Sequence, residues 1–358
     1  MDIKVLLVDD SAVIRRAVKT AIETEPGVKV VATANDGVHA LDVLKDTRVD
    51  IVVSDLEMPH MDGAQLCQKI ANLYPRLPVI VLSGAASQSR ITVAALAGGA
   101  VDYVSKPSGA NVANVMEELR MNLVPKIKTH ALRRAGGHLT GMMPAGGGAS
   151  ATAGGSYTLR PRKTGRVSAV GIAVSTGGPQ ALSKVLADIP ADLGVPVLIV
   201  QHMPPTFTGL LADRLNSVCP LEVREAQGGE EVARGVWIAP GGKHMVAVRR
   251  GSKIMLETNE DPPEQSCRPA ADVLLRSMAG VWGAEVLCVV LTGMGADGTN
   301  GSKSVIENGG SVISQDSESS VVWGMPGSVA KAGLVETVLP LDKVAQEITA
   351  RVRAGRLR

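Results

Sequence analysis

The sequence predicts an α/β protein with two domains, and three observations carry this prediction. From the N-terminus to about residue 123, short apolar runs alternate with amphipathic segments, the pattern of a doubly wound parallel sheet. The alternation resumes at residue 166 and continues toward residue 358, which indicates a second α/β domain with a mainly parallel sheet. The segment between them, residues 124–165, is rich in glycine and alanine, and we expect a flexible linker there.

The composition narrows the class of protein. A chain of 358 residues is long enough for two hydrophobic cores, and its net charge of +2 with 2% aromatic residues argues against nucleic-acid binding. The four cysteines are scattered without a C-x-x-C pair, as in a protein with reduced thiols. We find no signal peptide and no apolar stretch that could span a bilayer, so we expect a cytoplasmic protein without direct membrane insertion.

The first domain contains five apolar runs of strand length. Between the first two runs, apolar side chains from Val13 to Ile22 fall on one face of a predicted helix. The expected strands are Lys4–Val8, Val28–Ala32, Ile51–Ser54, Val79–Ser83 and Val101–Ser105.

Polar residues stand where these strands end. Asp9 and Asp10 follow the first strand, Asp55 the third, Ser83 closes the fourth, and Lys106 follows the fifth. The carboxyl ends of parallel strands form one ligand-binding edge. Three converging carboxylates repel one another unless a hard cation such as Mg²⁺ is present, and a lysine and a hydroxyl beside them would bind an anionic group. One such residue could be an ordinary polar loop end, but five at the matching strand ends argue against that interpretation.

The motifs around these residues resemble a response-regulator receiver domain, whose fold is a flavodoxin-like doubly wound sheet. The resemblance covers the whole segment and implies phosphoryl transfer from a histidine kinase to Asp55. It also implies that Asp10, Asp55 and the backbone carbonyl of Glu57 hold Mg²⁺, with Asp9 acting through water. The matching stretches are Val8-Asp9-Asp10-Ser11, Ser54-Asp55-Leu56-Glu57-Met58-Pro59, Met61-Asp62-Gly63, Leu82-Ser83-Gly84 and Asp102-Tyr103-Val104-Ser105-Lys106-Pro107.

Three further roles follow from the same resemblance. Lys106 and Ser83 would contact the phosphoryl group, and Tyr103 matches the switch aromatic of the family, although half-buried packing is an alternative for that ring. A phosphate at this edge adds charge that can draw Ser83 and Lys106 toward it and bias a two-state surface.

The predicted linker carries many basic side chains and no acidic one. It could touch an acidic partner, or it could be a solvated tether.

The second domain begins after the predicted linker. Its expected strands are Val167–Val174, Val195–Gln201, Val236–Ala239, Val286–Leu291 and Ser311–Ser314, with a hairpin of Met245–Arg249 and Lys253–Glu257. Its expected helices are Pro179–Asp188, Gly209–Asn216, Pro269–Ala279, Gly301–Glu307 and Leu341–Val352.

Ser175 follows the first strand of the second domain at a turn into a helix. Gly177 and Gly178 end the strand, and Pro179 suits the first turn of a helix. A serine at such a turn projects its hydroxyl from the end of the sheet, as a nucleophile does, but the spacing is not G-x-S-x-G. A glycine-rich phosphate loop or a plain helix cap fits the same stretch.

Two other polar residues extend this pattern. His202 follows the second strand, and Asp297 lies in the loop after a later one, so a parallel sheet would bring both to the edge that holds Ser175. A serine needs a base to take its proton, and that base needs a carboxylate to fix its tautomer. Alone, His202 could be a capping or core histidine and Asp297 a turn residue, but together with Ser175 they indicate a hydrolase triad.

The motifs around the three residues resemble the catalytic domain of the chemotaxis protein-glutamate methylesterases of the CheB type. With the receiver in front, the resemblance covers the whole chain. The matching stretches are Val174-Ser175-Thr176-Gly177-Gly178-Pro179, Gln201-His202-Met203, Phe207-Thr208, Ile238-Ala239-Pro240-Gly241-Gly242-Lys243-His244-Met245 and Leu291-Thr292-Gly293-Met294-Gly295 with Asp297-Gly298.

This second resemblance implies hydrolysis of glutamyl methyl esters on chemoreceptors and deamidation of receptor glutamines. Ser175 would be the nucleophile and His202 its base, and no cofactor would serve the hydrolysis. Backbone N–H groups of Thr176 and Met294 are the candidate oxyanion donors. His244 and Cys267 are reactive residue types, but we expect them to be structural or incidental.

The order of the two predicted domains also suggests how the hydrolase is regulated, and three other functions compete with the methylesterase interpretation. A phospho-acceptor domain ahead of a hydrolase suggests that the unphosphorylated first domain inhibits the second. A DNA-binding output is a common partner of receivers, but residues 166–358 lack a compact DNA-reading motif and a basic face. A non-catalytic adaptor would lack one of the three triad residues, and an unrelated serine hydrolase under phosphorylation control differs only in substrate.

Overall fold

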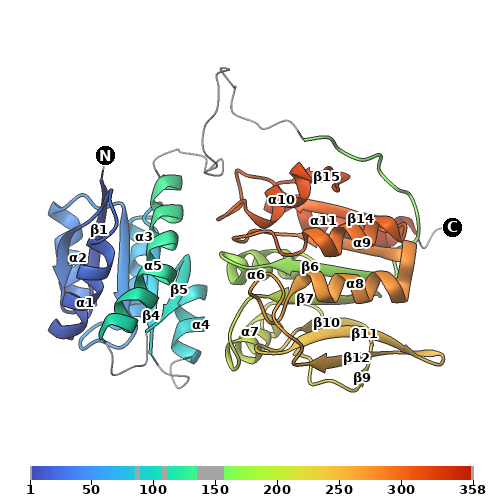
Figure 1. The fold of residues 1–358 in the computed structure, drawn as a ribbon, viewed down its shortest axis with the longest axis horizontal. Coiled ribbons are helices and arrows are strands. Elements are labelled where there is room, and N and C mark those ends of the chain that lie inside the picture. Colours follow the sequence, from blue (N-terminus) through green and yellow to red (C-terminus); the bar gives the residue numbers. More distant parts are fainter. Residues whose placement is uncertain (1, 85–88, 107–111, 135–156, 356–358) are drawn as a thin grey trace. The chain divides into compact units, whose positions relative to one another are not determined.

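The computed structural model describes residues 2–84, 89–106, 112–134 and 157–355 (Figure 1). The chain divides into two compact units, residues 1–143 and 144–358, and each is described by itself. The elements of the first unit are β1 (Ile3–Val8), α1 (Ala12–Glu23), β2 (Val28–Ala34), α2 (Gly37–Asp46), β3 (Ile51–Asp55), α3 (Gly63–Leu73), β4 (Val79–Ser83), α4 (Ser89–Ala97), β5 (Asp102–Ser105) and α5 (Val112–Arg134).

The first unit is a doubly wound α/β sheet, as the sequence predicts. Its strands are parallel in the order β2-β1-β3-β4-β5, and the reversal of order at β1 and β3 places a topological switch point between them. Helix α1 packs on α5, whereas α3 packs between α2 and α4, so the helices form two groups. The central strands β3 and β4 are buried along their whole length and β1 from Val5 to Val8, as is typical of a parallel sheet covered on both faces.

Helix α5 continues past residue 123, where the sequence analysis ended the first domain. It runs to Arg134 and contains Pro125. Leu123, Ile127 and Ala131 lie in the core of this unit, and their burial extends the helix into the segment that was predicted to be a linker. The glycine-rich residues 135–156 lie outside the described residues, so a flexible tether there stays a prediction.

The second unit contains a larger parallel sheet. Seven strands follow the order β15-β14-β13-β6-β7-β10-β8, and a separate antiparallel sheet follows the order β11-β12-β9. The elements are β6 (Ala169–Val174), α6 (Gly178–Ala187), β7 (Pro196–Gln201), α7 (Phe207–Asn216), β8 (Val223–Glu225), β9 (Glu230–Glu231), β10 (Gly235–Ile238), β11 (His244–Arg250), β12 (Lys253–Asn259), α8 (Ala271–Trp282), a 3₁₀ turn η2 (Gly283–Glu285), β13 (Val286–Val290), α9 (Thr299–Glu307), β14 (Ser311–Gln315), α10 (Met325–Lys331), β15 (Thr337–Leu339) and α11 (Leu341–Ala354).

Within residues 157–355 the structure contains five short elements that the sequence did not predict: β8, β9, η2, α10 and β15. Strands β8 and β15 have three residues each and lie at the two edges of the large sheet. So short a run carries no readable apolar period, and only pairing with β10 and β14 makes these segments strands.

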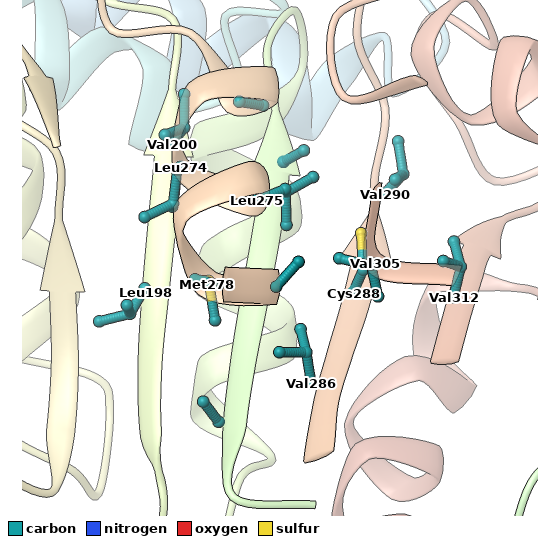
Figure 2. Close-up of a cluster of buried hydrophobic side chains, with 14 of the residues drawn as sticks. Leu198, Val200, Leu274, Leu275, Met278, Val286, Cys288, Val290, Val305 and Val312 are labelled. Atoms are coloured by element: carbon teal, nitrogen blue, oxygen red, sulfur yellow. The ribbon is translucent and has the colours of Figure 1, made fainter. Parts of the chain in front are cut away.

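The core of the second unit holds α8 against the central strands. Figure 2 shows Leu274, Leu275 and Met278 of α8 among side chains of β7 and β13. A Cβ added to Gly171 of β6 would lie 2.8 Å from Leu275 Cδ2, so this glycine allows α8 to approach the strand closely. The packing fixes the N-terminus of α8 near the ends of β6, β7 and β13.

None of the helices that the structure describes combines the length and the apolar character needed to cross a bilayer.

Candidate active site and phosphorylation site

The candidate active site lies where the order of strands reverses. Strand β6 has β7 on one side and β13 on the other, so its carboxyl end is the switch point of the large sheet. Val174 pairs with Gln201 in the ladder, which makes Ser175 and His202 direct neighbours one position further on. The His202 N–H donates to the carbonyl of Val174 at 3.2 Å and continues this pairing.

The turn that presents Ser175 is tightly held. Gly177 has φ 77°, a conformation that favours glycine, and α6 begins directly after it. The carbonyl of Ser175 accepts hydrogen bonds from the Gly178 N–H at 2.8 Å and from Gln201 Nε2 at 3.0 Å. Gln201 is buried, and sequence analysis assigned it no role although it lies in the matching motif. A Cβ on Gly178 would come within 1.8 Å of Gln201 Oε1, so a larger residue there would displace the Gln201 side chain.

Asp297 joins His202 to the start of α8. Its Oδ2 lies 2.7 Å from His202 Nε2 and accepts the Ala271 N–H at 2.6 Å, while Oδ1 accepts the Asp272 N–H at 2.9 Å. Burial would raise the pKa of this carboxyl, but the hydrogen bonds from His202 and the backbone outweigh it and hold the pKa below the ordinary value. Asp297 is therefore an oriented carboxylate at a helix N-terminus.

The ring of His202 is occupied on both nitrogens. Nε2 faces Asp297, and Nδ1 lies 3.6 Å from Cys267 Sγ. Burial alone would lower the pKa of His202, but the interactions with Asp297 and Cys267 raise it to about 9. Cys267, expected to be structural or incidental, thus contacts the candidate base.

The Ser175 hydroxyl makes no hydrogen bond to His202 within the part of the chain that the structure describes. Since Asp297 takes Nε2, the nitrogen left to accept the serine proton is Nδ1. Catalytic hydrogen bonds are often long in free enzymes and tighten when substrate binds. The arrangement therefore brings the three predicted residues to one edge and leaves the Ser175–His202 contact to be formed.

The backbone around Ser175 offers donors for an oxyanion. Among the described hydrogen bonds, the N–H groups of Thr176 and Met294 have no acceptor. A Cβ on Gly293 would lie 2.8 Å from Ser175 Cβ, so this glycine brings the loop that carries Met294 against the serine. The two predicted donors therefore belong to segments that meet at Ser175. His244, by contrast, accepts the Ala270 N–H on Nδ1 and donates Nε2 to the carbonyl of Pro262, which fits a structural role.

Two groups of side chains in the described residues have metal-binding donors. Carboxylate oxygens of Asp9, Asp10 and Asp55 lie within 4.8 Å of one another, which fits a hard cation such as Mg²⁺. His202, Asp297 and Cys267 are similarly close, but the carboxylate and the thiol face different nitrogens of one ring. One ion cannot bind both sides of an imidazole, so this second group is a hydrogen-bonded chain.

Lys106 joins the carboxylates of the first unit. Its Nζ lies 3.0 Å from Asp9 Oδ2 and 2.8 Å from Asp55 Oδ2. Burial raises the pKa of the Asp55 carboxyl, and Lys106 only partly offsets this effect. Burial would lower the pKa of Lys106, but its two carboxylate partners raise it above the ordinary value. The carboxyl edge of this sheet therefore holds a buried aspartate, Asp55, with the ammonium group of Lys106 beside it.

The other predicted residues of this edge are arranged differently. Ser83 is buried, and its hydroxyl lies 2.8 Å from the hydroxyl of Thr92 on α4. Tyr103 is half-buried, burial raises the pKa of its phenol, and the ammonium of Lys126 lies 5.4 Å from its ring centroid. Glu57 is exposed, and the part of its carbonyl in metal binding stays a prediction.

Fold and site define a class of protein, a two-domain α/β enzyme in which a domain with a carboxylate cluster precedes a hydrolase domain. A family model described as CheB methylesterase matches residues 170–348, and one described as response regulator receiver domain matches residues 5–117. The chain belongs to the CheB methylesterase family and carries a receiver domain ahead of its catalytic domain.

Similar proteins cover nearly the whole chain. A protein-glutamate methylesterase/protein-glutamine glutaminase of Trichodesmium erythraeum is 42% identical over 98% of this chain and 99% of its own length. One of Desulfotalea psychrophila is 41% identical over the same shares. The crystal structure of the Thermotoga maritima CheB methylesterase catalytic domain covers 51% of this chain and 98% of that chain, with 40% identity and a TM-score of 0.51.

Proposed function

We propose that this protein hydrolyses glutamyl methyl esters on chemoreceptors, deamidates receptor glutamines to glutamate, and is activated by phosphorylation of Asp55. The observation that carries the proposal is the hydrogen-bonded pair of His202 and Asp297 beside Ser175 at the switch point of the sheet. The names of the full-length relatives support the substrate class. We assign residues 1–123 to the receiver, 124–165 to a linker and 166–358 to the catalytic domain, with α5 extending the last receiver helix to Arg134.

The reaction uses the three residues in sequence. Ser175 Oγ attacks the ester carbonyl while His202 Nδ1 takes its proton, and Asp297 stabilises the imidazolium through Nε2. N–H groups of Thr176 and Met294 bind the oxyanion of the tetrahedral intermediate. The imidazolium gives its proton to the departing methanol. Water then cleaves the acyl-enzyme with His202 as base, which yields glutamate; a glutamine amide follows the same path with ammonia as leaving group.

The receiver edge supplies the control. Asp10, Asp55 and the backbone carbonyl of Glu57 would hold Mg²⁺, with Asp9 acting through water, and the ion would offset negative charge on the phosphoryl group. Asp55 accepts the phosphoryl group from a histidine kinase. Lys106, which pairs with Asp55 here, would turn to the phosphate, and Ser83 would leave Thr92 for it. Tyr103 would follow this change as the switch residue.

The experiment that tests the function measures methanol release from methylated receptor fragments, with and without a small phosphodonor and Mg²⁺. We expect release that rises several-fold with phosphodonor and Mg²⁺ in the wild-type chain. Asp55→Asn should keep the basal rate and lose the rise, because an amide cannot accept the phosphoryl group. Asp42→Asn, on the exposed face of α2, is the matched control and should respond like wild type. If the wild-type chain releases no methanol, the esterase activity is rejected. If the rate of Asp55→Asn rises with phosphodonor as much as that of wild type, Asp55 is rejected as the phosphorylation site.

The pH dependence provides a separate prediction. His202 acts as a base only when neutral, and its pKa is raised to about 9. Below that pH the neutral fraction grows about tenfold per pH unit, so kcat/KM should rise with pH and level off near pH 9. Methanol release from the unphosphorylated chain, corrected for spontaneous ester hydrolysis, measures this profile. A rate that is flat between about pH 6.5 and 8.5 contradicts the assignment of His202 as the base.

A further inference from the structure

Cys267 is placed against the one atom of His202 that the proposed reaction needs. Its Sγ lies 3.6 Å from Nδ1, and Nε2 is already bound to Asp297. A thiol can donate a weak hydrogen bond to a neutral imidazole nitrogen, and a thiolate can accept one from an imidazolium. Either way, Cys267 engages the nitrogen that must receive the Ser175 proton.

The backbone holds Cys267 in this position. Glu264 and Cys267 exchange two backbone hydrogen bonds, and the residues between them, Gln265 and Ser266, have φ of 50° and 61°. Positive φ at both central residues defines a tight turn that favours glycine, so the two side chains here are held in a strained backbone. Glu264 is also bound by Arg276 of α8. A strained and anchored turn therefore places the thiol, which marks the contact as a built feature of the site.

We propose that Cys267 is a positioning residue for hydrolysis, one that occupies Nδ1 of His202 in the resting site and gives it up to Ser175 when substrate binds. The proposal rests on the proposed function, in which Ser175 and His202 act together. It predicts that the thiol slows the basal reaction, because Ser175 must displace it before the proton can move. It also predicts that the contact helps to hold the ring while no substrate is bound.

The charges around His202 agree with this role. Asp297 and Cys267 are the titratable groups in contact with the ring, and both raise the pKa of His202 against the effect of burial. Asp272 acts one step further away, on Asp297, and Arg276 of α8 is the nearby cation. Cys267 favours the imidazolium when its sulfur accepts the hydrogen bond of the protonated Nδ1. Without this acceptor, Asp297 would remain as the partner that favours the imidazolium, and the neutral base would be more populated at pH 7.

The test compares Cys267→Ala and Cys267→Ser with wild type and with Cys219→Ala, which removes a half-buried thiol elsewhere. The rising limb of kcat/KM against pH should move to lower pH by about half to one unit in Cys267→Ala. Because a less basic imidazole is also a weaker proton acceptor, we expect about a threefold higher kcat/KM at pH 7. A serine hydroxyl can still accept a hydrogen bond from the protonated Nδ1, so Cys267→Ser should lie between the two, and Cys219→Ala should match wild type.

An NMR titration of the His202 ring separates this proposal from the proposed function. The signal is identified among the six histidines by its loss in His202→Gln, and its midpoint should fall in Cys267→Ala whether or not the chain hydrolyses esters. An unchanged midpoint overturns the role of Cys267, and so does a lower rate without a shifted profile. A Cys267→Ser profile that coincides with Cys267→Ala overturns the competition for Nδ1. A shifted midpoint in a chain that releases no methanol keeps the contact and rejects the proposed function.

Discussion

Replacing Ser175 with alanine is expected to lower kcat/KM for methanol release by roughly 10⁴–10⁶-fold. The substitution removes the atom that forms the acyl-enzyme, and His202 is left without the serine proton to accept. The oxyanion donors and the substrate-binding contacts remain. In serine hydrolases these alone accelerate the reaction about 10³–10⁴-fold over the rate in water. The measurement is methanol release at saturating phosphodonor and Mg²⁺, where the wild-type rate is highest.

The fold should not change in this variant. Ser175 is held by its backbone, through Gly178 and Gln201, and its hydroxyl has no hydrogen bond in the part of the chain that the structure describes. Ser183→Ala on α6 removes a hydroxyl that, within the described residues, binds the carbonyl of Pro179, so it is a matched control with unchanged activity. Equal rates in Ser175→Ala and wild type would contradict the assignment of Ser175 as the nucleophile. Only the receiver assignment would then remain supported.

The second large effect is expected from Asp297→Asn, about 10³–10⁴-fold in kcat/KM. The amide can present its NH₂ group to Nε2 of His202, which then becomes the acceptor and leaves the proton on Nδ1. That tautomer cannot take the proton of Ser175. The same NH₂ group would also face the N–H of Ala271, because Oδ2 accepts both contacts in the wild-type chain, so an unsatisfied donor should cost about 1–3 kcal/mol of stability.

Asp272→Asn serves as the control for this loss of stability. Asp272 is a buried carboxylate that accepts the Gly301 N–H at 2.6 Å and makes no contact with His202 in the described residues. Its replacement should lower Tm to a similar extent and keep most of the activity. If both variants lose activity in proportion to Tm, Asp297 is a structural cap of α8 and the base acts without it.

The side chains at the two candidate sites could be predicted from short stretches of the sequence. A parallel strand ends at a definite residue, and the polar residues after it must lie on the ligand-binding edge, so Asp55, Lys106, Ser175 and His202 could be placed there without a structure. The glycines around Ser175 also had local meaning, because positive φ and close packing exclude other side chains. The roles of these residues in catalysis and phosphorylation stay predictions.

The neighbours of these groups were decided only by tertiary structure. Strand order puts β13 beside β6, which brings Asp297 to both His202 and the N-terminus of α8 over 95 residues of chain. Tertiary packing in the second unit sets Cys267 on Nδ1, and packing of α4 in the first unit sets Thr92 on Ser83; no periodicity encodes either contact. Helix α5 extends into the predicted linker because its apolar side chains find a place in the core. Chemistry at a strand end is a local property of this sequence, whereas its hydrogen-bond partners depend on which distant segments the sheet and its helices bring together.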